Sequence, residues 1–81
     1  MKYQIFYEKE ASKELEKLEP IVSRRIVNKI EKMSENPSLC DIKKIKSTDY
    51  YRLRVGDYRV IFIFESDIIK VFKVSHRQQI Y

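Results

Sequence analysis

The feature that most restricts the fold of this chain is its single glycine, Gly56, which lies in the stretch YYRLRVGDYRVIF at residues 50–62. On both sides of Gly56-Asp57, aromatic and β-branched residues alternate with arginines, a pattern typical of strands. A two-residue hairpin loop needs a positive φ at its first central position, which glycine adopts without strain. The sequence therefore predicts an antiparallel hairpin that turns at Gly56 and Asp57.

The position of this turn determines which residues lie opposite each other. Arg54 then faces Arg59, and Arg52 faces Ile61. Because side chains alternate across a sheet, all three arginines project from one face. The other face receives the apolar and aromatic residues Tyr51, Leu53, Val55, Tyr58, Val60, Phe62 and Phe64. Since directly opposed like charges destabilise a strand pair, the arginines indicate a binding site for an anion. A solvated face, with arginine stems covering apolar surface, is the alternative interpretation.

The rest of the chain alternates between strand and helix periodicities. Residues 2–8 predict an opening strand and residues 8–18 a short amphipathic helix. A second helix is predicted to begin at Pro20 and to be stopped by Asn36-Pro37. Further strands are expected at 50–55, 58–65 and 68–75, with a second turn at Ser66-Asp67. Residues 38–49 contain the run KKIK, show no clear periodicity, and are predicted to form a mobile loop.

This order of elements, β-α-α-β-β-β, predicts an α+β fold in which a helix hairpin covers one face of a mostly antiparallel four-stranded sheet. With 81 residues, the chain supplies one thin core, and residues 1–81 are expected to form a single domain. A chain of this length does not supply a second layer of helices, so the arginine-bearing face should stay open. The pattern leaves undecided whether the first strand lies at the sheet edge or beside the last hairpin.

The net charge of +5 is concentrated in the second half of the chain. Residues 1–40 carry eight Lys/Arg against seven Asp/Glu, whereas residues 41–81 carry nine against five. A clustered basic charge favours a polyanionic partner such as a nucleic acid. No apolar run is long enough to span a bilayer and the first residues lack an apolar signal segment, so we expect a cytoplasmic protein without membrane contact.

The residues available for chemistry favour catalysis without a metal or other cofactor. A single cysteine and a single histidine argue against a disulfide and a zinc site, and Cys40 is interpreted as a passive thiol. No glycine-rich phosphate loop, acidic metal cluster or Ser-His-Asp arrangement is present. Cleavage of RNA through its own 2′-hydroxyl fits these residues, because the substrate supplies the nucleophile.

His76 is the one side chain expected to titrate near neutral pH. With a two-residue turn at Ser66-Asp67, Arg59 would lie opposite Val74, and His76 would follow on the same face as the arginines. This position makes His76 a candidate for proton transfer. An incidental surface histidine is the alternative.

The motifs YRLRVGDYRVIF and VFKVSHRQQIY together resemble the RelE/ParE superfamily of type II toxin-antitoxin toxins, and within it the RelE-like mRNA interferases. The resemblance extends over essentially the whole chain. It implies a ribosome-dependent endoribonuclease that cuts mRNA in the ribosomal A site by 2′-hydroxyl attack, leaves a 2′,3′-cyclic phosphate and so inhibits translation. It also implies a cognate RelB-like antitoxin that holds the toxin inactive in a heteromeric complex.

The resemblance also implies roles for residues at the motif positions. Arg59 resembles the arginine that stabilises the transition-state phosphate, and Arg77 the arginine that aids the leaving 5′-oxygen. Tyr81 resembles the tyrosine that orients a base and the 2′-hydroxyl. The remaining expected contacts with messenger or ribosomal RNA are Arg52, Lys43, Lys44 and Lys46.

The identity of the general base departs from the family pattern. Arg52 and Arg54 stand where some relatives carry two lysines, one of them proposed as the base. A guanidinium stays protonated in proteins and does not readily accept a proton, so Arg54 is assigned an electrostatic role. Proton transfer is then assigned to His76, with Tyr81 in support.

Two other functions stay open. The chain could be a ParE-like inhibitor of DNA gyrase or another topoisomerase without nuclease activity, or a degenerate member that only binds RNA or its antitoxin. The HR-x-x-x-Y tail together with Arg59 favours the ribonuclease, because ParE-like members usually lack this combination.

Overall fold

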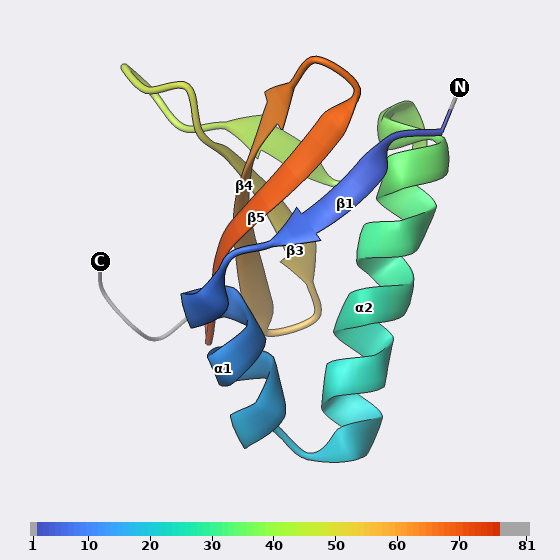
Figure 1. Cartoon of the computed structure of the whole chain (residues 1–81), viewed down its shortest axis with the longest axis vertical. Helices are drawn as coiled ribbons and strands as arrows, with labels where there is room; N and C mark the ends of the chain where they lie inside the picture. Colours follow the sequence, from blue (N-terminus) through green and yellow to red (C-terminus); the bar gives the residue numbers. More distant parts are fainter. Residues whose placement is uncertain (1, 77–81) are drawn as a thin grey trace.

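The computed structural model describes residues 2–76, and these residues form two α-helices and one five-stranded sheet (Figure 1). The helices are α1 (Lys9–Lys17) and α2 (Pro20–Glu35), and a 3₁₀ turn, η1 (Pro37–Leu39), follows them. The strands are β1 (Gln4–Tyr7), β2 (Ile42–Lys44), β3 (Tyr51–Val55), β4 (Tyr58–Glu65) and β5 (Ile68–His76). Their order in the sheet is β1-β5-β4-β3-β2. The predicted α+β fold is confirmed, with one strand more than expected.

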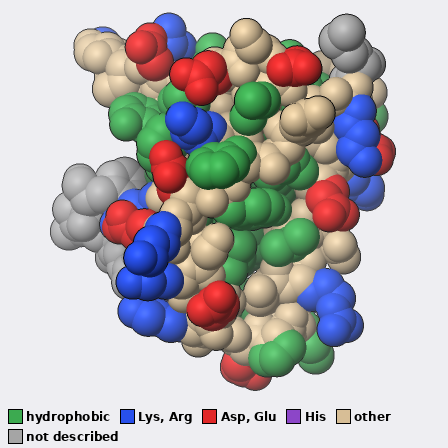
Figure 2. Space-filling model, viewed as in Figure 1, with side chains coloured by type: hydrophobic (Ala, Val, Ile, Leu, Met, Phe, Trp, Pro, Cys, Tyr) green, Lys and Arg blue, Asp and Glu red, His purple; other side chains and the backbone are tan. Residues whose placement is uncertain are grey.

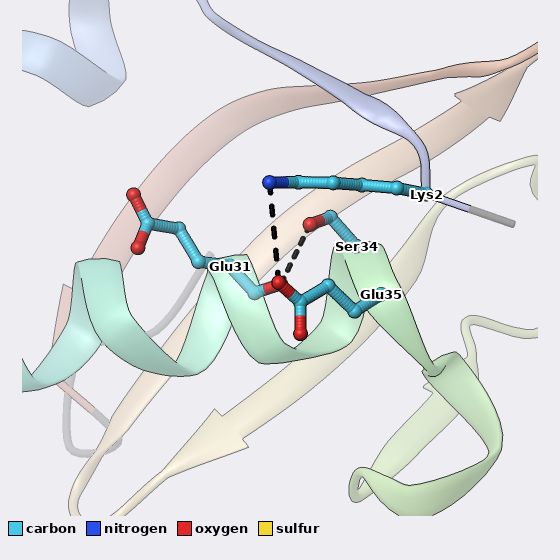
Figure 3. A network of polar contacts seen from close by, with 4 residues as sticks. All are labelled: Lys2, Glu31, Ser34 and Glu35. Atoms are coloured by element: carbon cyan, nitrogen blue, oxygen red, sulfur yellow. Dashed lines mark hydrogen bonds and ion pairs between the residues drawn. The ribbon is translucent and has the colours of Figure 1, made fainter.

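Strand β1 lies at one edge of the sheet and runs parallel to β5, whereas the other strand pairs are antiparallel. Its start is tied to the end of α2 (Figure 3). Tyr3 N donates to Ser34 O at 2.8 Å, and Ser34 Oγ donates to Glu31 O at 2.6 Å. Lys2 Nζ lies 3.9 Å from a carboxylate oxygen of Glu35. The contacts of Lys2 and Tyr3 with α2 help to hold β1 at the edge of the sheet, beside β5, a position that the sequence pattern left undecided.

Strand β2 lies in the segment predicted to be a mobile loop, so the prediction of a loop is wrong for residues 42–44, and also for Ser38 and Leu39 of η1. Ile42 pairs with Leu53, Lys43 with Arg52, and Lys44 with Tyr51. A three-residue edge strand with one apolar residue has no hydrophobic pattern to distinguish it from a loop. Its pairing with β3 is a tertiary contact, and its lysines suit a sheet edge that must not pair further.

The core lies between the helix hairpin and one face of the sheet (Figure 1). The helices contribute Ala11, Leu15, Ile26, Ile30 and Met33, and the sheet contributes Leu53, Val55, Val60, Phe62, Ile69, Val71 and Val74. Phe62 on the central strand β4 is fully buried and stacks on Tyr51, with ring centroids 5.7 Å apart. The alternate residues of β3 and β4 predicted to face the helices do so.

The hairpin of β3 and β4 has the predicted register. Arg54 lies opposite Arg59, Arg52 opposite Ile61, and Val55 opposite Tyr58. Gly56 has a φ of +57°, in the left-handed region that glycine adopts readily.

Replacing Gly56 by alanine should therefore lower the free energy of unfolding by about 1–2 kcal/mol, because an L-residue is strained in this conformation. A Cβ at Gly56 would meet nothing within 4 Å, so the loss comes from the backbone alone. Gly56→Asn should lose less, since asparagine tolerates positive φ. Urea unfolding followed by circular dichroism checks this order, and equal stability of the alanine variant and the wild type would contradict it.

Candidate functional site

Basic side chains from four strands project from the sheet face that the helices leave uncovered. We call this surface the arginine face, and it consists of Lys43, Arg52, Arg54, Arg59, Lys70 and Lys73. The strand register places them together, because Lys43 is opposite Arg52, Arg54 opposite Arg59, and Lys73 opposite Ile61 on the same side. The missed strand β2 thus adds Lys43 to the three predicted arginines.

Positive charge on this face is least compensated at β2 and β3. Lys70 lies 3.6 Å from a Glu65 oxygen, and Lys73 lies 4.0 Å from a Glu10 oxygen, so carboxylates approach β5. Among residues 2–76, no ion pair within 4.0 Å reaches Arg52 or Arg54. The buried Nε atom of Arg52 also lacks a hydrogen-bond partner within that range of residues. The β3 side is therefore the part of the face that can best receive an anion.

An apolar layer lies beneath the charged groups. Ile61 is on this face yet is only 9% exposed. Its two cross-strand partners are Arg52 and Lys73, whose long aliphatic stems can cover it. The two interpretations of the arginines are thus compatible, because the stems pack on the sheet while the charged ends remain at the surface.

His76 does not lie on the arginine face, and the predicted pairing of Arg59 with Val74 is wrong. Strands β4 and β5 shift register between Ile61 and Phe62, which places Ser75 opposite Arg59 and His76 opposite Tyr58. The rings of His76 and Tyr58 meet edge to face on the helix side, with centroids 5.2 Å apart. The cause is a β-bulge, which adds a residue to one strand and reverses the side on which each later residue lies.

Ser75 is the residue that sequence reasoning missed at this position. Its hydroxyl is buried, without a hydrogen-bond partner in the described part of the chain. Nothing in the local sequence marks the bulge, because neither glycine nor proline is present in β4 or β5. On the helix side, Glu14 Oε1 accepts a hydrogen bond from Val74 N at 2.8 Å and fixes this end of β5.

Of the other predicted site residues, two lie away from the arginine face and two lie outside the described part of the chain. Lys44 pairs with Tyr51 and so lies on the helix side of the sheet. Lys46 is exposed in the turn between β2 and β3. Arg77 and Tyr81 lie outside the described residues. The structure thus brings together Lys43, Arg52, Arg54 and Arg59, and separates Lys44, Lys46 and His76 from them.

A second surface feature is an apolar groove between the two helices, floored by β1. We call it the helix groove, and it is lined by Ile5, Tyr7, Ser12, Leu15, Glu16, Val27 and Glu31. Figure 2 shows hydrophobic side chains gathered along the middle of this side of the molecule. The Tyr7 hydroxyl is buried there without a hydrogen-bond partner among residues 2–76. Burial raises the pKa of Tyr7 above its ordinary value, and the nearby Glu31 carboxylate raises it further.

The described residues contain no group of three or more His, Cys, Asp or Glu that could hold a metal ion. Within the same residues, no helix is long and apolar enough to cross a membrane. Cys40 is a half-buried free thiol whose Sγ lies 3.9 Å from Asn36 O.

The fold of this small α+β domain, with a helix hairpin on one face of the sheet, is shared with toxins of type II toxin-antitoxin systems. The model of the family described as "ParE toxin of type II toxin-antitoxin system, parDE" matches residues 5–81. Toxin RelE3 of Methanocaldococcus jannaschii is 37% identical over 82 residues, which cover 95% of this chain and 93% of that protein. The chain belongs to the RelE/ParE superfamily of type II toxin-antitoxin toxins.

Solved structures of two archaeal complexes have the same fold. The toxin in the RelE-RelB complex from Pyrococcus horikoshii OT3 matches with a TM-score of 0.79 and 30% identity, covering 99% of this chain and 100% of that one. The RelB-RelE antitoxin-toxin complex from Methanococcus jannaschii matches with a TM-score of 0.73 and 35% identity, covering 90% and 91%. The fold expected from the family resemblance is thereby confirmed.

Proposed function

We propose that this toxin is a ribosome-dependent endoribonuclease that cuts mRNA through the 2′-hydroxyl of the substrate and so inhibits translation. The observation that carries the proposal is the directly opposed pair Arg54 and Arg59 on an uncovered sheet face. A phosphodiester bound between the two guanidinium groups accepts hydrogen bonds from both and relieves their mutual repulsion. The similarity to proteins named RelE toxins supports the same activity.

In this reaction the protein orients the RNA and stabilises charge. The 2′-oxygen attacks the adjacent phosphorus, a 2′,3′-cyclic phosphate forms, and the 5′-oxygen leaves with a proton. Arg59 stabilises the negative charge that develops on the phosphate, and Arg54 adds a second positive charge. Arg52 and Lys43 continue the basic surface along the RNA backbone. By resemblance, Arg77 aids the leaving oxygen and Tyr81 orients a base.

The RNA partners proposed for this toxin are mRNA in the ribosomal A site and the surrounding ribosomal RNA. Translation places the site of action in the cytoplasm. Exposed Lys46 and Lys44 lie outside the arginine face and are assigned to ribosomal RNA contacts. No cofactor enters the proposed reaction.

The proposed protein partner is a RelB-like antitoxin, since two relatives of the same fold are seen in complexes with RelB. The helix groove supports this proposal, because an amphipathic segment laid in it would cover apolar surface. The Tyr7 hydroxyl could then donate its hydrogen bond to the bound segment. The net charge of +5 favours an antitoxin that is acidic where it lies outside this groove, because the groove itself carries Glu16 and Glu31.

A second candidate function is inhibition of a DNA topoisomerase, which the ParE description of the matching family favours. A cell-free translation reaction with primer extension, run beside a gyrase supercoiling assay, separates the two. We expect cuts at codons in translated message and normal supercoiling. Intact message with blocked supercoiling would support the ParE-like activity. If neither occurs and the antitoxin still binds, the chain is a degenerate member.

His76 remains our candidate for proton transfer only through its resemblance to the HR form of the family motif, because its ring lies on the helix side of the sheet, at the end of β5. His76→Gln should then slow cleavage about 10²- to 10⁴-fold. It should also change the dependence of the cleavage rate on pH, because it removes a group that can take up and release a proton. Primer extension across a series of pH values measures both. Full cleavage with an unchanged pH profile would show that the ring, on the helix side, plays no part.

A further inference from the structure

Two aromatic rings, Tyr50 and Phe72, meet on the arginine face. Their centroids are 5.3 Å apart and the rings are nearly perpendicular, at 81°. Tyr50 directly precedes β3, two residues before Arg52, and is 39% exposed. Phe72 is the additional residue of the β5 bulge, because Ile61 pairs with Lys73 and Phe62 with Val71. The bulge that moves His76 off this face therefore supplies an aromatic ring to it.

This pair lies outside the aromatic cluster of the core. In that cluster, Tyr51 and Phe62 pack with Phe64 on the helix side of the sheet. Tyr50 is instead held at the surface by its backbone: its carbonyl accepts from Ile45 N at 2.9 Å and its N–H donates to Thr48 Oγ1 at 3.1 Å. A ring that is exposed, anchored and separate from the core is available to a ligand.

The charged side chains around the pair indicate which kind of ligand would bind there. Arg52 and Lys43 lie on the β3 side, where no ion pair with residues 2–76 compensates them. Lys73 adjoins Phe72 on β5. Aromatic rings for bases, combined with cations for phosphates, are what proteins use to bind single-stranded nucleic acid. An uncharged peptide would leave these cations without partners.

We propose that Tyr50 and Phe72 form a stacking platform for one nucleobase of single-stranded RNA bound to the arginine face. The proposal rests on the proposed function, because it takes RNA as the ligand. Tyr50 precedes Arg54 by four residues, a separation of roughly 13 Å along an extended chain. The stacked base therefore belongs to a nucleotide flanking the one whose phosphate meets Arg54 and Arg59. The platform would contribute to affinity and to the choice of base at that position.

A binding titration with single-stranded RNA, 2′-O-methylated so that it is not cut and dye-labelled for fluorescence polarisation, tests the platform. Tyr50→Leu and Phe72→Leu should each weaken binding about tenfold, within the range found for loss of base stacking. Tyr50→Phe should bind like the wild type, because stacking needs the ring and not the hydroxyl. The dependence of affinity on salt should keep its slope in Tyr50→Leu and become shallower in Arg54→Ala, which removes a phosphate contact.

A second binding experiment removes one base of the RNA at a time and measures the affinity of each abasic RNA. At one position, an abasic nucleotide should weaken binding by the wild type as much as Tyr50→Leu does, with no further loss when both changes are combined. Phe6→Leu is the control, since Phe6 is 51% exposed on the same face but beside Lys70, at the far edge. Its affinity should not change. Thermal unfolding of each variant confirms that leucine keeps the fold.

Three results would overturn the platform. The first is equal RNA affinity of Tyr50→Leu and the wild type, and the second is an abasic series without effect. The third is unchanged RNA affinity together with lost antitoxin binding, which would assign the rings to the protein partner. If the wild type cuts translated mRNA while any of these holds, the proposed function stands and the platform fails. If the wild type neither binds RNA nor cuts mRNA, both fail together.

Discussion

Arg59→Ala is expected to reduce the rate of mRNA cleavage about 10²- to 10³-fold, the usual loss when one donor to a developing negative charge is removed. Arg59 comes from the central strand β4 and lies directly opposite Arg54, on the face that the helices leave uncovered. Its guanidinium can donate two parallel hydrogen bonds to phosphate oxygens, a geometry that an ammonium does not reproduce. Arg59→Lys should therefore restore only part of the rate. Primer extension in a cell-free translation reaction measures these rates.

Lys13→Ala is the matched control for this substitution. Lys13 is exposed and basic and lies on α1, in the helix layer on the other side of the sheet. Its removal lowers the net charge by the same amount without touching the arginine face, and cleavage should stay within a few-fold of wild type. Equal effects of Arg59→Ala and Lys13→Ala would mean that net charge alone matters, and the assigned site would be wrong.

The stability of the Arg54→Ala variant provides a second test of the role of the arginine pair. Because like charges lie opposite each other at Arg54 and Arg59, Arg54→Ala should raise the free energy of unfolding by about 0.2–1 kcal/mol while it slows cleavage. A gain in stability together with a loss of activity would show that the pair is held for binding and not for the fold.

Phe62→Ala is expected to remove a large part of the free energy of unfolding of this domain. Phe62 is fully buried at the centre of the sheet and contacts the rings of Tyr51 and Phe64, with centroids 5.7 and 5.3 Å away. Truncating a buried phenylalanine costs about 3–5 kcal/mol, and small domains are stable by only about 5–15 kcal/mol in total. Urea unfolding followed by far-ultraviolet circular dichroism measures the loss.

Phe6→Ala is the comparison for the core substitution. Phe6 is 51% exposed at the β1 edge, so its truncation should change the free energy of unfolding by no more than about 0.5 kcal/mol. A loss below about 1 kcal/mol in Phe62→Ala would mean that the core is not centred on β4 and that the register of the sheet is different.

Family membership alone does not decide between the two activities, because the family whose model matches is described as ParE toxins while the relatives with substantial identity are named RelE. The arrangement of the arginine face favours the ribonuclease. Arg52, Arg54 and Arg59 lie together with Lys43 on a single surface, where they can follow a phosphate backbone. The cell-free translation assay and the supercoiling assay distinguish the ribonuclease from the topoisomerase inhibitor.

The parts of the structure that were predicted correctly depend on contacts between near neighbours in the chain. The turn at Gly56 and the alternation on either side of it were sufficient to pair Arg54 with Arg59 and to separate the arginines from the core. Helix α2 was recognised because its apolar stripe is bounded by Pro20 and Pro37. Each of these signals lies within a short window of the sequence.

The sequence by itself thus determined the β3–β4 hairpin, the helix hairpin and the face on which three arginines lie. Only the tertiary structure decided that β2 pairs with β3 and adds Lys43, and that β1 lies parallel to β5. It also decided the bulge that places Ser75 opposite Arg59, His76 on the helix side and Phe72 beside Tyr50. The physical reason is that turn type and side-chain alternation are local properties, whereas strand neighbours and bulges follow from packing between distant segments.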